Sequence, residues 1–264
     1  SSGLRYVTPQ VFRMPVTVRV GMGASEAKVT TWLSAREQEI TVPGVTSAPT
    51  MVIFDDGNTI LKQLTFQQPT AWLANQLARD PDLWNRNWVI EQLRGRKDDA
   101  EAVAALGRAA TGSDYFLTRV QAAQALGGMT GDLARQALLT ASRDTSAQVR
   151  AAAVASLGPD GGEAGKARAQ ELWARDTSYA VQGAALGALV RLDPANAHAL
   201  LQRGLTTPSY QDAILDAALG AIIRTNDTTM IEAVDGAVAR SGNAAFVLGL
   251  LGARGATRAD GRSR

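Results

Sequence analysis

The sequence predicts an α+β chain in two domains, a small antiparallel β domain followed by an all-α solenoid. Up to about Phe66, apolar and polar residues alternate, as in strands with one buried face. From Pro69 onward, alanine and leucine recur at helical spacing. The helical part also repeats about every 32 residues, and a repeat of this length with two helices per unit is typical of an α-solenoid.

Five segments of the first part have the composition of short antiparallel strands. In the first, Val16, Val18 and Val20 share one face, and Thr17 and Arg19 share the other. The segments are residues 14–20, 27–33, 38–42, 50–54 and 59–66.

The stretch TMVIFDDGNTILKQL raises the question of an acidic site, because it brings together Asp55, Asp56 and Asn58. A calcium loop needs further oxygen ligands at alternating positions, and Thr59 followed by Ile60 does not supply them. Glycine and asparagine tolerate positive φ, so the residues fit a hairpin turn between two strands better.

The helical part has recognisable starts and stops, which predict ten or eleven helices. Asp80 before Pro81 is expected to be an N-cap. Further starts are expected at Asp98 and Asp99, Ser113, Asp144, Ser146 and Asp176, and stops at Gly95, Gly112, Gly158 and Gly204.

The repeat is anchored by a polar residue followed seven positions later by leucine. Asp144 and Asp176 precede two of these anchors by six residues and are expected to bridge neighbouring units. Small residues three after an anchor let helices approach closely. The anchors are Arg86, Arg119, Arg150, Gln182 and Asp212, and the small residues are Ala122, Ala153 and Ala185. This pattern resembles HEAT-like repeats over roughly residues 80–225.

Composition excludes several kinds of site. The chain has no cysteine, which removes disulfides, thiolate metal sites and cysteine nucleophiles and leaves the compartment open. Its one histidine, His198, cannot build a site that needs two imidazoles. The net charge of +2 does not indicate a nucleic-acid surface, and no apolar run is long enough for a membrane span. The start, SSG, looks like a cloning remnant or an interior cut, and residues 254–264 look like a solvated basic tail.

Two further sequence features are weak signals of a binding site and fit structural roles better. The glycine pair beginning at Gly21 lacks the helix of a dinucleotide site and fits a hairpin loop. Trp72, Trp84 and Trp88 are expected in the core between the first helices and the β domain, with a ligand-stacking surface as the alternative.

The order of the β motifs resembles the region that follows the catalytic domain in aminopeptidase N-like zinc metallopeptidases. The matching residues are Phe12, Pro15 and Val16, then Pro49, Val52, Phe54 and Asp55. The resemblance implies a small β-sandwich over residues 1–67, possibly incomplete, and a HEAT-like domain over residues 68–253. It also implies a zinc-binding catalytic domain elsewhere in the parent. Neither the family's H-E-x-x-H nor its G-x-M-E-N motif is present, so no catalytic, cofactor or metal residue is assigned to this chain.

These observations leave two main functional hypotheses. The first is a non-catalytic scaffold and lid of a zinc aminopeptidase, whose partners are the catalytic domain and the peptide substrate in the concave face of the solenoid. The alternative is a free-standing HEAT-repeat module that binds a protein or peptide. An enzyme with an unrecognised carboxylate site is the weakest of the hypotheses, because no convergent acid cluster is visible.

Overall fold

The computed structural model describes residues 11–225 and 227–240, and the structural statements below concern this part of the chain. The chain divides into two compact units, residues 1–89 and 90–264. The SSG start and the tail at residues 254–264 lie outside the described residues. Within the described part, no helix combines the length and apolar character that a membrane crossing requires.

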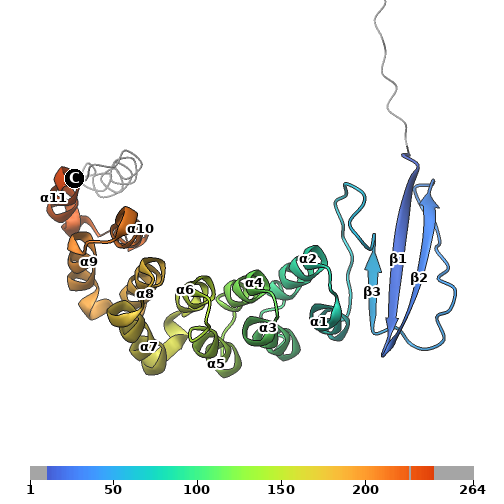
Figure 1. Cartoon of the computed structure of the whole chain (residues 1–264), viewed down its shortest axis with the longest axis horizontal. Helices are drawn as coiled ribbons and strands as arrows, with labels where there is room; N and C mark the ends of the chain where they lie inside the picture. Colours follow the sequence, from blue (N-terminus) through green and yellow to red (C-terminus); the bar gives the residue numbers. More distant parts are fainter. Residues whose placement is uncertain (1–10, 226, 241–264) are drawn as a thin grey trace, which may run out of the picture. The chain divides into compact units, whose positions relative to one another are not determined.

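The first unit contains a three-stranded antiparallel sheet (Figure 1). Its strands are β1 (Met14–Met22), β2 (Ser25–Leu33) and β3 (Met51–Phe54), in the order β2-β1-β3. One face buries Val18, Val20 and Met22 against the partly buried Ile40 and Val42, which follow β2 without joining the sheet. Alternation therefore predicted this buried face correctly.

Two of the predicted strands are not strands, and the expected β-sandwich is not found. Residues 38–42 and 59–66 form no strand, so the described part contains a single sheet instead of two packed sheets. The apolar residues of 38–42 still cover the sheet, which explains why their pattern resembled that of a strand.

The Asp55–Asn58 segment forms a turn, as predicted, but not a hairpin. Asp55 and Asn58 have φ of 56° and 51°, and the Asn58 amide donates to the Asp55 carbonyl at 2.9 Å. The buried Asp55 carboxylate accepts from the amides of Thr59 and Ile60 at 3.0 and 3.1 Å. It also pairs with Lys62, so these side-chain bonds hold the segment after the turn outside the sheet.

The rest of the described chain contains eleven α-helices, at the upper end of the predicted number. They are α1 (Thr70–Arg79), α2 (Leu83–Arg94), α3 (Ala100–Gly112), α4 (Phe116–Leu126), α5 (Asp132–Ala141), α6 (Ala147–Ser156), α7 (Gly162–Arg175), α8 (Tyr179–Leu192), α9 (Ala197–Thr206), α10 (Ala213–Thr225) and α11 (Ile231–Arg240).

Two of the predicted helix boundaries are wrong. Asp80 does not cap α2; Asp82 does, because its carboxylate accepts from the amides of Trp84 and Asn85 at 2.8 and 3.1 Å. Gly204 does not end a helix but lies inside α9, where a Cβ would come within 2.5 Å of Leu186. Asp99 caps α3, as predicted.

The helices of the second unit form two layers that follow the repeat. In one layer, α4 contacts α6, α6 contacts α8, and α8 contacts α10. In the other layer, α3 contacts α5. Within this unit, the even-numbered helices lie on the inside of the curve (Figure 1). We call their exposed surface the inner face. Ala122, Ala153 and Ala185 are fully buried between these helices, as the repeat predicted.

Adjacent repeats are joined by a ladder of ion pairs. Arg119 pairs with Asp144 of the next repeat at 2.7 Å, and Arg150 pairs with Asp176 at 2.8 Å, each through two guanidinium nitrogens. Arg150 also donates to the Asp144 carbonyl at 3.0 Å, so it holds the turn that precedes its own helix. The expected bridging role of these residues is confirmed.

Candidate functional site

A shallow groove crosses the inner face of the second unit. Its volume is about 480 Å³, within the range of ligand-binding sites, and residues of α4, α6 and α8 line it. Small side chains form the floor, and two glutamines are the longest polar ones. The lining residues are Val120, Gln124, Ala147, Gln148, Ala151, Ala152, Ala155, Ser178, Ala180 and Ala184.

The groove exists because the repeat places small residues on this face. Relative to the anchors Arg119 and Arg150, positions one and five residues later point into it, since they are about one helical turn apart. Ala151 and Ala155 occupy these positions in α6, so helix backbone is close to the surface.

The inner face differs in charge from the outer layer. The exposed residues of α4 and α6 are uncharged, namely Leu117, Gln124, Gln148 and Ala155. The exposed residues of α3 and α7 include Glu101, Arg108, Glu163, Glu171 and Arg175. Charged residues are depleted in the cores of protein interfaces, so the part of the inner face over α4 and α6 has the composition of a docking surface. Further along the same face, α8 and α10 expose Arg191, Asp216 and Arg224.

Exposed apolar side chains lie where the inner helices begin. Leu117 lies in the first turn of α4, Tyr179 begins α8, and Tyr210 lies just before α10. Tyr210 is 73% exposed, which is unusual for a large aromatic ring without a partner. Aromatic rings of this kind are frequent anchors in protein recognition.

Two arginines lie where the inner helices end. Arg191 in the last turn of α8 donates to the carbonyls of Gly187, Ala155 and Leu157 at 2.8, 2.7 and 3.2 Å. Burial lowers the pKa of the Arg191 guanidinium, and the like charge of Arg224 lowers it further. The two cations are therefore close enough to repel each other.

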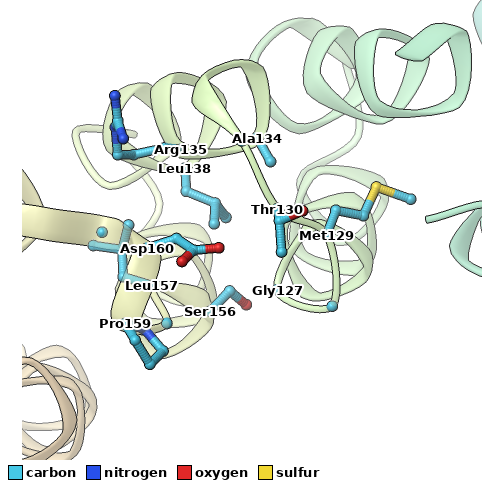
Figure 2. Close-up of a pocket in the computed structure, with 14 residues that line it drawn as sticks. Gly127, Met129, Thr130, Ala134, Arg135, Leu138, Ser156, Leu157, Pro159 and Asp160 are labelled. Atoms are coloured by element: carbon cyan, nitrogen blue, oxygen red, sulfur yellow. The ribbon is translucent and has the colours of Figure 1, made fainter. Parts of the chain in front are cut away.

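A second hollow, of about 200 Å³, lies among the loops that follow α4 and α6 (Figure 2). Figure 2 shows the Asp160 carboxylate turned into it, with Ser156 and Thr130 nearby and Arg135 directed away. Five glycines contribute to its lining, and its volume is below that of most ligand pockets. We therefore take the inner-face groove as the candidate site.

The residues considered from the sequence do not converge on a catalytic centre in the described part. His198 is exposed near the start of α9, where its ring contacts Gln202 and Thr229 at 2.9 and 3.2 Å. Trp84 is 74% exposed, so its expected place in the core is wrong. Within residues 11–225 and 227–240, no group of three His, Cys, Asp or Glu side chains could hold a metal ion.

A comparison with protein families agrees with the repeat architecture. A family-level comparison matches residues 70–158 to HEAT repeats. Among solved structures, the chain is similar to one described as the complex of CpcE and CpcF of phycocyanin lyase from Nostoc sp. PCC7120. The identity is 18%, the TM-score is 0.41, and the match covers 75% of this chain and 98% of that chain. No curated protein matches.

The resemblance to the C-terminal region of a zinc aminopeptidase is therefore wrong. The family-level comparison finds HEAT repeats, not a metallopeptidase. The motif that carried the resemblance, Pro49 to Asp55, belongs to a single sheet and leads into no further strand. The assignments to an aminopeptidase, a metallopeptidase, a hydrolase and a missing zinc-binding catalytic domain are wrong with it.

Proposed function

We propose that the chain is a HEAT-repeat module that binds a protein or peptide partner on its inner face. The observation that carries this proposal is the uncharged, alanine-lined groove across α4, α6 and α8, beside an outer layer that exposes charged residues. A face that needed only to remain soluble would have no reason to exclude charge from the exposed residues of the neighbouring helices α4 and α6.

The floor of the groove fits a partner segment with its own apolar side chains. Alanine leaves room above the helix backbone, and Gln124 and Gln148 can hydrogen-bond to polar groups of the partner. Leu117 and Tyr179 extend the apolar area where the helices begin. We also propose that the β domain ends near residue 67 and that the helical domain follows it.

Site-specific photo-crosslinking tests the binding proposal. A benzophenone amino acid replaces Gln148 on the inner face, and a matched variant carries it at Gln170, which is exposed on α7 in the outer layer. In extract of the source organism, we expect discrete adducts from position 148 and none from position 170.

A blocking variant makes the test specific for the groove. Ala151→Trp places a large ring in the groove and should abolish the adducts, whereas Ala167→Trp, at an exposed position of α7, should leave them unchanged. Circular dichroism checks that both variants remain folded. Equal adducts at positions 148 and 170, or adducts that persist in Ala151→Trp, would refute the proposal.

A further inference from the structure

An arginine of α8 and an arginine of α10 converge on one point of the inner face. Nη2 of Arg224 lies 3.4 Å, and Nη1 of Arg191 4.0 Å, from where a Cβ on Gly187 would be. Nη1 of Arg224 also lies 3.3 Å from the corresponding point on Gly220. Glycine at both positions thus leaves the space in which the Arg224 guanidinium lies over α8 and α10.

Gly187 is buried in α8 and does not itself line the groove, to which α8 contributes Ala180 and Ala184. The link between the arginine pair and the groove is Ala155, which lines the groove from α6. The Ala155 carbonyl accepts from Arg191, so one residue of α6 contacts both features. Arg191 therefore adjoins the groove at Ala155, and Arg224 lies beside Arg191.

The two arginines have different surroundings. Arg191 uses three hydrogen bonds on the carbonyls where α6 and α8 end, a structural role favoured by the helix dipole. The helix dipole also favours Arg224 in the last turn of α10, but does not explain why it turns toward Arg191.

No acidic side chain in the described part neutralises this pair by an ion pair. Asp216, the acidic residue of α10, is two turns earlier, about 12 Å along the helix. A guanidinium presents its donors in a fork that matches a carboxylate, so two adjacent guanidinia form a strong carboxylate site.

We propose that Arg191 and Arg224 bind a carboxylate of the partner, and that the partner segment in the groove is therefore acidic as well as apolar. This inference rests on the proposed binding function of the inner face. It adds the chemistry of the partner, since an Asp or Glu side chain or a free C-terminus would be held beside the groove where Ala155 contacts Arg191.

A peptide-display selection tests the inference without knowledge of the natural partner. A random peptide library is selected on the immobilised full chain, with the Ala151→Trp chain used for counter-selection. We expect peptides in which apolar residues are followed by an Asp or Glu. Binding of the best peptide should weaken at least about tenfold in Arg224→Gln, as loss of a charged hydrogen bond predicts.

The matched control is Arg175→Gln, which removes an exposed arginine from the last turn of α7 in the outer layer and should change affinity less than twofold. Amidation of the peptide's acidic residue should reproduce the loss in the wild-type chain. Amidation of the peptide should cause little further loss of affinity in Arg224→Gln, because the peptide's acidic group and Arg224 act in the same contact. Circular dichroism confirms that the arginine variants remain folded.

The outcomes separate the two proposals. Groove-dependent peptides without acidic enrichment, or equal affinity for both arginine variants, would overturn the carboxylate site and leave the binding function standing. The absence of any peptide that distinguishes the chain from Ala151→Trp would overturn the binding function, and the carboxylate site with it. Asp260 is the acidic residue of the tail at residues 254–264, outside the described residues. A large gain in affinity on Asp260→Asn would assign the arginine pair to the chain's own carboxylate and overturn the inference.

Discussion

The ladder between repeats makes a quantitative prediction for Asp176→Asn. The Asp176 carboxylate, whose side chain is 5% exposed, accepts from Nε and Nη2 of Arg150 at 2.8 and 3.0 Å. It also accepts from the Ser178 amide at 2.9 Å, just before α8. The substitution keeps the size of the side chain, removes its charge and replaces one of the two oxygens that accept from Arg150 by an amide donor.

The expected loss of stability follows from the burial of the Asp176 carboxylate and from its hydrogen bonds. Hydrogen bonds to a charged group contribute about 1.5–3 kcal/mol, and breaking a fully buried pair costs about 3–5 kcal/mol. Arg150 keeps its bonds to the carbonyls of Asp144 and Thr145, so its charge does not become wholly unsatisfied. We therefore expect Asp176→Asn to lower the free energy of unfolding by about 2–3 kcal/mol, near the lower of the two ranges.

Thermal unfolding followed by circular dichroism measures this effect. A loss of this size in a unit of this length lowers the melting temperature by roughly 5–10 °C. Asp98→Asn is the matched control, because Asp98 is exposed in the loop before α3, and its melting temperature should fall by no more than about 2 °C. A shift for Asp176→Asn as small as that of the control would refute the view that the ladder joins the repeats.

Two further predictions concern the same chemistry. Arg19→Gln should destabilise the first unit by about 3 kcal/mol or more, because Asp80 is 0% exposed and loses its 2.7 Å ion pair. Hydrogen exchange of α1 measures the loss of stability. A change no greater than that caused by Arg13→Gln would contradict the prediction. Burial acts to raise the pKa of the Asp176 carboxyl, but the hydrogen bonds from Arg150 and Ser178 outweigh it, so the pKa lies below the ordinary 3.8. The stabilisation by the Asp176 carboxylate is therefore full above its pKa in the unfolded chain, and it is lost as the pH falls through its pKa in the folded chain. The difference in urea midpoint between wild type and Asp176→Asn should therefore narrow below about pH 4. A difference that stayed constant would contradict this reasoning.

The helical part was predictable because its rules are local and repeated. Ala153 and Ala185 show the rule for close packing, and Arg150 with Asp176 shows the rule for bridging; each occurs more than once in the sequence. Gly204 was misread because a glycine that permits close contact with Leu186 looks the same in sequence as one that ends a helix. Only the neighbouring helix distinguishes the two roles.

The β part was less predictable, because side chains compete with strands for the backbone. The alternation in residues 59–66 predicts a strand, but the Asp55 carboxylate binds the amides of Thr59 and Ile60 instead. The candidate site was missed for a different reason. Its lining residues are mostly alanines, and they become a groove only when the anchors show which positions of α6 and α8 face inward.

The ion pair of Arg19 suggests how the sheet relates to the repeats. Asp80 stands six residues before its anchor Arg86, as Asp144 does before Arg150, and in both cases the anchor's guanidinium donates to the aspartate's carbonyl. Inside the ladder, the aspartate's carboxylate is bound by an arginine of the preceding repeat. The Asp80 carboxylate pairs with Arg19 of β1 instead, so the sheet supplies the arginine that a preceding repeat would supply. The same charge pairing therefore serves both the first repeat and the later ones, which is why one substitution in β1 and one before α8 are expected to act alike.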